Sequence, residues 1–186
     1  MRRFALVLAV LAVAGMTASA AQGVSVHFKG DHSLPTFNDQ GLVLSMTGVL
    51  AGLGNYDTAI TLTATGQPTA DCVNPGSGEH RPPGQQPAEV TLVGTTLVSA
   101  SDIKNGNVSI TVTTGAPTTP VPGAPGCPNS NWTENITEVS FSSATFTVVQ
   151  DSNANGAFEE APSLSGSCTF SPSTSNGAVP GASVSC

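Results

Sequence analysis

Apolar and polar residues alternate strictly in several stretches of the chain. The pattern is clearest at Ile60–Thr65 and Val108–Thr113, where every second residue is apolar and the residues between are threonine or serine. A period of two places the apolar side chains on one face of a β-strand, and β-branched threonine suits the pleat while its hydroxyl stays in water. Both stretches are therefore predicted to be half-buried strands.

Weaker alternation predicts more strands, and turn residues separate them. The further candidates are 24–29, 42–50, 88–93, 95–100, 136–141, 145–150, 167–170 and 182–186. Asn105-Gly106, directly before the Val108 strand, is typical of a tight hairpin turn. No stretch between the candidates has the period of a helix. Many short strands at this spacing favour an all-β fold, an antiparallel β-sandwich of immunoglobulin-like architecture.

A true immunoglobulin domain is not expected. In such a domain a tryptophan follows the first core cysteine by about a dozen residues. Here Trp132 lies five residues after Cys127. The prediction is therefore limited to the sandwich architecture.

The start of the chain reads as an export signal. Arg2 and Arg3 precede an apolar run, 4–15, and Ala18-Ser19-Ala20 offers a cleavage site. Residues 1–20 are therefore predicted to be a secretory signal peptide, and residues 21–186 a single domain delivered to the periplasm or the extracellular space. Cleavage removes two of the five basic residues, so three remain against 12 acidic ones and the formal charge changes from −7 to −9.

Charge and hydropathy exclude two classes of partner. The cations left after cleavage are Lys29, Arg81 and Lys104, too few to form a phosphate-binding face, so nucleic-acid binding is not expected. No later apolar stretch approaches the roughly 18 residues of a transmembrane helix, so the mature chain is not expected to be embedded in a membrane. The partner expected is a protein or a glycan.

Four cysteines remain in the mature chain: Cys72, Cys127, Cys168 and Cys186. An even count in an exported protein favours two disulfides, for which three connectivities are possible. Cys168–Cys186 is favoured because each cysteine lies in a short candidate strand and a turn rich in glycine, proline and serine joins the two strands. This leaves Cys72–Cys127. A metal site is disfavoured because no C-x-x-C or Cys/His cluster is present.

Two long proline-rich loops, 74–87 and 115–128, interrupt the strand pattern. Proline lacks the N–H that a sheet needs, so both loops are expected outside the sheets, with Cys72–Cys127 holding them together at one end. Long loops on a rigid scaffold often carry binding. The alternative is that they are stiff, protease-resistant connectors.

Six short blocks of the sequence together resemble a pattern found in other proteins. They are Gly52–Asn55, Ile60–Gly66, Pro87–Val90, Ile103–Asn107, Gly126–Thr133 and the pattern C-x-F-x-P … N-G-x-V-P … C from Cys168 to Cys186. This set, which covers most of the mature chain, resembles blocks in a group of small exported microbial all-β proteins. The resemblance implies an all-β secreted fold and does not extend to an activity.

The stretch 151–160 begins like a calcium-binding loop, with side-chain oxygens at alternate positions and a glycine where such loops turn sharply. Its candidate ligands are Asp151, Asn153, Asn155, Glu159 and Glu160. Pro162 stands where the usual bidentate glutamate would be, so one of the two glutamates has to replace it. The alternative is a polar hairpin with two solvated glutamates.

Other metal and catalytic motifs are weaker. His27, His32 and His80 lack the spacing of a metal site, and ordinary surface histidines are the preferred interpretation. No G-x-S-x-G motif is present, and the many serines have no recognisable base nearby in the sequence. Nucleophilic catalysis is therefore not expected.

Three glutamates and two aromatic residues complete the candidates. Glu89, Glu134 and Glu138 would have to converge in space to form the carboxylate pair of a hydrolase. Trp132, with Tyr56, is the candidate for stacking on a sugar, and its alternative role is to anchor the loop over Cys127.

These observations lead to three functional hypotheses. The first is a non-catalytic exported module that interacts with a surface or matrix and binds a protein or a glycan. The second is a calcium-stabilised carbohydrate-binding domain that uses Trp132 and the loop 151–160. The third is a small secreted hydrolase that uses paired carboxylates.

Overall fold

The structure is a computed structural model that describes residues 25–30, 34–76 and 87–186. The proposed signal peptide, residues 1–20, lies outside this range. The described part is all-β and contains no α-helix. Its strands are β1 (His27–Phe28), β2 (Thr36–Asp39), β3 (Leu44–Ala51), β4 (Thr58–Val73), β5 (Val90–Val98), β6 (Val108–Thr113), β7 (Thr133–Gln150), β8 (Leu164–Phe170), β9 (Gly177–Ala178) and β10 (Val184–Ser185). Two short 3₁₀ turns, η1 (Ala100–Asp102) and η2 (Gly181–Ser183), complete it.

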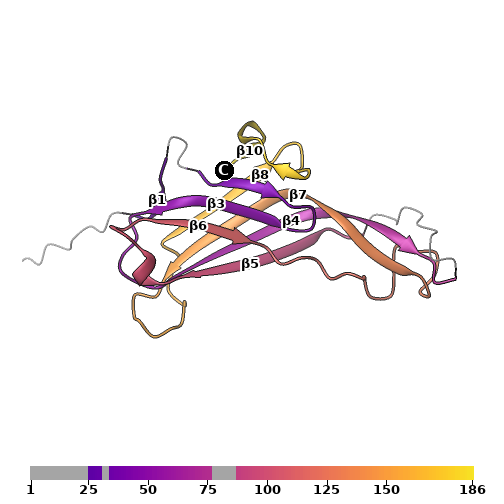
Figure 1. Cartoon of the computed structure of the whole chain (residues 1–186), viewed down its shortest axis with the longest axis horizontal. Helices are drawn as coiled ribbons and strands as arrows, with labels where there is room; N and C mark the ends of the chain where they lie inside the picture. The colour runs from indigo at the N-terminus through magenta and orange to yellow at the C-terminus, as the bar shows by residue number, and fades with distance from the viewer. Residues whose placement is uncertain (1–24, 31–33, 77–86) are drawn as a thin grey trace, which may run out of the picture.

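The strands form two antiparallel sheets that pack face to face (Figure 1). The first has the order β1-β3-β2-β9, with β6 also paired to β3, and the second has the order β10-β8-β7-β4-β5. The core between the sheets contains two edge-to-face aromatic pairs, Phe28–Phe146 and Phe37–Phe170, with ring centroids 5.3 and 5.1 Å apart. The predicted disulfide-stapled β-sandwich is confirmed.

Two long strands form the spine of the molecule. β4 has 16 residues and β7 has 18, and they pair from Thr58 with Gln150 to Val73 with Thr133. Figure 1 shows their far ends reaching beyond the other strands, toward the proline-rich segment 115–128. A strand of 18 residues spans about 60 Å, so the residues before and after β7 lie at opposite ends of the molecule.

The prediction of two separate strands at 136–141 and 145–150 is wrong, because β7 is continuous. Two β-bulges interrupt its alternation: Thr137 and Ser142 are extra residues where the register with β4 shifts. Their hydroxyls donate to the carbonyl oxygens of Thr69 and Thr65, at 3.3 Å each. Each bulge moves the next apolar residue back to the core face, so the sequence pattern restarts within one strand.

The division of 88–93 from 95–100 is also wrong, because β5 runs through Gly94. This glycine marks a close approach. A Cβ at Gly94 would lie 1.9 Å from the carbonyl oxygen of Thr113 at the end of β6. The strand therefore needs glycine where it passes the neighbouring backbone.

The remaining strands either lie close to their predicted positions or are too short to produce an alternating pattern in the sequence. β6 has the predicted bounds, and the Asn105-Gly106 turn has positive φ at both residues, 51° and 72°. Lys104 and Asn107 exchange two backbone hydrogen bonds of 2.9 Å across it, as in a type I′ hairpin turn. Of the predicted strand 24–29, residue 24 lies outside the described residues, and the described part forms only β1; β2 and β9 match none of the predicted strands.

Both favoured disulfides, Cys72–Cys127 and Cys168–Cys186, are present. The second joins β8 to the residue after β10, and these two strands pair as expected. Two disulfides are typical of proteins that fold in an oxidising compartment. Within the described residues, no helix has the length and hydropathy needed to cross a membrane.

Removing either disulfide is expected to lower the free energy of unfolding, and the longer loop should matter more. The bonds close loops with sequence separations of 55 and 18 residues. Chain entropy then gives a loss of about 4 kcal/mol for Cys72→Ala/Cys127→Ala and about 3 kcal/mol for Cys168→Ala/Cys186→Ala. Urea unfolding of both double variants measures the difference. A greater loss from the shorter loop would contradict the entropic account.

Candidate functional site

The segment 115–125 builds a groove beside β5. The N–H of Gly115 donates to the carbonyl of Val93 at 2.9 Å, and the segment then leaves β5. It rejoins the sheet at β7, where Val121 donates to the carbonyl of Glu134 at 2.7 Å. Between these two points lies a cavity of about 880 Å³.

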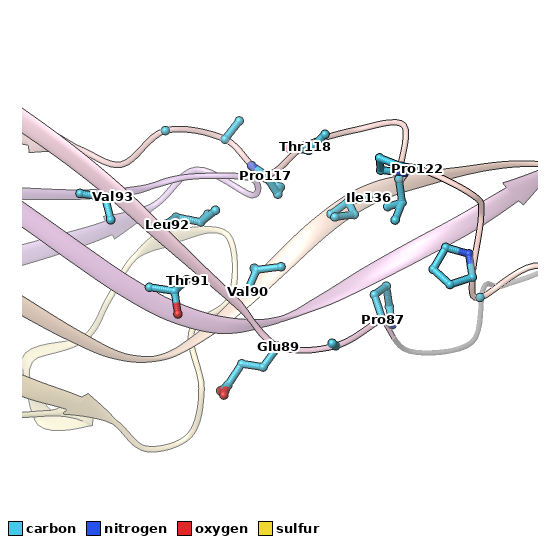
Figure 2. A pocket seen from close by; sticks show the side chains of 16 residues that line it. Pro87, Glu89, Val90, Thr91, Leu92, Val93, Pro117, Thr118, Pro122 and Ile136 are labelled. Atoms are coloured by element: carbon cyan, nitrogen blue, oxygen red, sulfur yellow. The ribbon is translucent and has the colours of Figure 1, made fainter.

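The walls of the groove are mostly apolar. Figure 2 shows Val90 and Leu92 of β5 pointing toward Ile136 of β7, with Pro117 and Pro122 on the opposite wall. Glu89 and Thr91 point away from the cavity in the same view, as the alternation of a strand requires. Glu89 nevertheless borders the groove through the part of the residue nearest the backbone, and it is the one charged residue among the described residues at this border.

The edge of β5 that borders the groove carries backbone groups without a strand partner. β5 is the last strand of its sheet and pairs only with β4 among the described strands. Because the carbonyl of Val93 points away from β4, toward Gly115, the N–H and C=O of Thr91 point to the same edge. The groove therefore combines apolar side chains with a main-chain donor and acceptor that have no partner among the described residues.

Glu134 holds the far wall of the groove in place. Its side chain is fully buried, and its Oε2 accepts a hydrogen bond of 3.0 Å from the N–H of Gly126. Its neighbour in the β4–β7 register is Cys72, whose disulfide partner Cys127 follows Gly126. Oε1 of Glu134 has no hydrogen-bond partner within the described residues. A carboxylate and a disulfide thus fix the same point of the proline-rich segment.

Trp132 lies at this end of the molecule, directly before β7. It is half-buried, and its backbone N–H donates to the carbonyl of Asn129 at 3.2 Å. It is not among the residues that line the groove. Its predicted role in sugar stacking stays a prediction.

The proposed calcium loop lies at the other end, after β7 (Figure 1). Asp151 is buried, and its two oxygens accept hydrogen bonds from the N–H groups of Asn155 and Gly156 at 3.1 and 2.7 Å. Oε1 of Glu160 accepts from Ser152 and from both the backbone and the amide of Asn153. The structure thus brings Asp151, Asn153, Asn155 and Glu160 into one loop. Glu159 is exposed.

Several oxygens of this loop accept hydrogen bonds within the loop, whereas Oε2 of Glu160 is buried without a hydrogen-bond partner in the described part of the chain. Oδ1 of Asn155 accepts a hydrogen bond of 2.9 Å from Ala157. In the described part of the chain, no three His, Cys, Asp or Glu side chains gather as a metal site would need. Calcium binding stays a prediction of the sequence, and the carboxylate of Asp151 has a structural role of its own.

Asp151→Ala is expected to lower the melting temperature in EDTA as well as in calcium chloride. Two backbone N–H groups lose their acceptor, at a cost of about 1–3 kcal/mol. Differential scanning calorimetry of the variant and the unmodified protein in both buffers measures this. A loss confined to the calcium buffer would show that the carboxylate acts as a metal ligand and not as a brace for the loop.

The candidate histidines show no metal-site geometry within the described range. His27 lies in β1, is exposed, and places its Nδ1 2.8 Å from the carbonyl of Ser25. His32 and His80 lie outside the described residues.

The three candidate glutamates have separate partners. Glu89 accepts a 3.4 Å hydrogen bond from Ser142, and Glu138 accepts one of 3.5 Å from Asn176. Glu134 is buried against Gly126. None of these contacts joins two carboxylates, so the hydrolase hypothesis gains no support from them.

No protein-family model, no curated protein and no solved structure matches the chain. Sequence reasoning placed binding at the proline-rich loops but did not find the β5 side of the groove. The sequence signal that could have located the β5 side is the pair of apolar residues Val90 and Leu92. They follow Pro87, where a strand meets a proline-rich loop.

Proposed function

We propose that the protein is a non-catalytic exported interaction module that binds an extended segment of a partner protein in the groove beside β5. The observation that carries this proposal is the main-chain edge of β5, which has no strand partner among the described residues, along a mostly apolar cavity of about 880 Å³. An extended peptide satisfies both features, because its backbone pairs with the edge and alternate side chains enter the cavity.

The chemistry of the partner follows from the walls. A strand added beside Thr91 exchanges main-chain hydrogen bonds with it, and apolar side chains on one face of that strand pack against Val90, Leu92 and Ile136. Aliphatic side chains of valine size suit walls built from valine, leucine, isoleucine and proline.

The net negative charge of the protein predicts which residues flank the bound segment of the partner. The chain carries 12 acidic and five basic residues, and Glu89 stands at the rim of the groove. Basic residues beside the apolar part of the partner are therefore favoured, and their contribution falls as salt rises.

Prolines, a disulfide and a buried hydrogen bond restrain one wall of the groove. Pro117, Pro122 and Pro125 restrict the backbone of one wall, and the disulfide Cys72–Cys127 and the Glu134–Gly126 hydrogen bond fix its end. A preformed site loses little conformational entropy on binding, so a modest contact area still supports measurable affinity.

The test uses a panel of short synthetic peptides that alternate valine and threonine and carry lysine at both ends. Val90→Lys places a charge in the groove and is expected to weaken peptide binding at least about tenfold in biolayer interferometry. Leu97→Lys is the matched control, since Leu97 lies on the same strand and is 67% exposed. Failure of the whole panel to bind, or equal losses in both variants, would contradict the proposal.

A further inference from the structure

A second cavity lies at the opposite end of β7 from the groove. It has a volume of about 640 Å³ and is lined by residues from four separate stretches of the chain, within 52–56, 105–106, and at 150 and 163, and by the start of the described chain. The lining residues include Leu53, Gly54, Tyr56, Asn105, Gln150 and Ser163. None of its described lining residues is charged. The described lining therefore offers no charged side chain to pair with a charged ligand.

Tyr56 supplies an exposed aromatic ring whose position is fixed. Its side chain is 43% exposed, which is unusual for a large residue in this chain. The ring packs so closely on Gly54 that a Cβ there would lie 2.7 Å from its Cδ2. The backbone is held as well, because the buried hydroxyl of Thr58 donates to the carbonyl of Tyr56 at 3.0 Å.

Gln150 supplies a hydrogen-bond donor that the described protein does not use. Its Nε2 is buried and has no partner within the described residues, although the side chain lines the cavity. An unpaired buried amide costs about 1–3 kcal/mol, so such a group calls for an explanation. Gln150 ends β7, and the N–H of Asp151 after it donates to the carbonyl of Asp57 at 2.9 Å. This bond fixes the backbone at the end of β7, and a Cβ at Gly54 would lie 3.4 Å from Nε2 of Gln150, which places the amide beside the Tyr56 segment.

The Asn105-Gly106 turn closes the third side. The carbonyl of Gly106 accepts a 3.1 Å hydrogen bond from Leu53, which joins the turn to the segment that carries Tyr56. Asn105 is exposed at the rim and brings a second amide to the cavity. The lining thus includes one aromatic residue, two residues with side-chain amides, and Ser163, whose hydroxyl donates to the carbonyl of Val148 at 3.4 Å.

We infer that this cavity is a binding site for a neutral saccharide. A pyranose ring has an apolar face that packs on an aromatic side chain, and its hydroxyl oxygens accept hydrogen bonds from amides. Tyr56 provides the platform, and Nε2 of Gln150 donates to a sugar oxygen. Tyr56 is thus the aromatic residue that stacks on the sugar in this cavity, and Trp132 lies at the other end of β7. This inference stands apart from the peptide groove.

The experiment titrates ¹⁵N-labelled protein with cellotriose, N,N′,N″-triacetylchitotriose and mannotriose, each up to millimolar concentration, and follows amide resonances by NMR. At least one trisaccharide is expected to shift the side-chain amide of Gln150 and the backbone amide of Tyr56. Tyr56→Ala is expected to lower the affinity for that trisaccharide about tenfold. Tyr56→Phe keeps the ring, and its affinity is expected to lie within about twofold of that of the unmodified protein.

Two controls separate this inference from other outcomes. Leu34→Ala removes another exposed apolar side chain, 46% exposed, and should leave saccharide binding unchanged. Val90→Lys, which blocks the peptide groove, should also leave it unchanged, so each proposal can fail without the other. The inference is overturned if none of the three trisaccharides shifts these amides, or if Tyr56→Ala binds as well as the unmodified protein while its melting temperature is preserved.

Discussion

Replacing Gly94 by alanine is expected to lower the free energy of unfolding by more than about 4 kcal/mol. A Cβ at this position would lie 1.9 Å from the carbonyl oxygen of Thr113, 2.6 Å from its carbonyl carbon and 2.8 Å from the Cα of Thr114. All three atoms belong to the backbone, so no side-chain rotation relieves the clash. Urea unfolding, followed by circular dichroism, measures the loss.

The expected loss is large because the clash opens one side of the sandwich. β5 and β6 come from different sheets and meet here, where Thr96 donates to the carbonyl of Thr111 at 3.1 Å and Gly115 donates to Val93. Gly115→Ala is the matched control, because its nearest neighbour would be 3.5 Å away, an ordinary contact. Equal unfolding midpoints for the two variants would show that β5 and β6 do not approach as closely as described.

Asp39→Ala is expected to lower the free energy of unfolding by about 2–5 kcal/mol, because two buried donors lose their acceptor. The carboxylate is only 2% exposed and accepts hydrogen bonds from the N–H of Gly41 at 2.8 Å and from the hydroxyl of Thr174 at 2.5 Å. Thr174 in turn accepts from the N–H of Phe141 at 2.9 Å. The network thus joins β2, β7 and the segment after β8.

A double-variant cycle tests this network. Asp39→Ala and Thr174→Val remove the two ends of one hydrogen bond, so their combined loss should fall short of the sum by about 1–3 kcal/mol. Asp57→Ala is the control, since Asp57 also accepts a backbone N–H, at 2.7 Å from Ala100, but is exposed, and its loss should be clearly smaller. Additive losses for Asp39 and Thr174 would contradict the described contact.

Local alternation was enough to predict the strands that lie in one register. Ile60–Thr65 and Val108–Thr113 keep their period because no bulge interrupts them, and both lie within strands as expected. The cysteine pairing was also within reach, because the strands around Cys168 and Cys186 are close in sequence.

The errors have physical causes that a local pattern does not contain. In a sequence, a glycine inside a strand pattern indicates either the end of the strand or a close approach of another backbone. At Gly94 only the position of Thr113 in the folded chain shows that the second interpretation holds. The bulges at Thr137 and Ser142 shift the period by one residue each, so one strand of 18 residues looked like two. β9 has only two residues and leaves no period to detect.

The candidate sites also depend on the order and pairing of the strands, which a local sequence pattern does not contain. Proline-rich loops were predicted to carry binding, and segment 115–125 does form one wall of the groove. That β5 is an edge strand depends on the order of the sheet, which no local signal encodes. Trp132 and the loop after Asp151 entered one hypothesis together, yet the full length of β7 separates them. Tyr56 and Gln150 meet only because β4 and β7 pair at that end.

Hydrogen exchange at the amide of Thr91 tests the central proposal most directly. The account predicts that this N–H, which points to the free edge of β5, exchanges rapidly in the free protein. In the complex with a lysine-flanked valine–threonine peptide its exchange should slow by about a hundredfold or more, while the amide of Leu92, which pairs with Ala64 of β4, stays protected throughout. Unchanged exchange at Thr91 in the peptide-saturated protein would contradict strand addition at this edge.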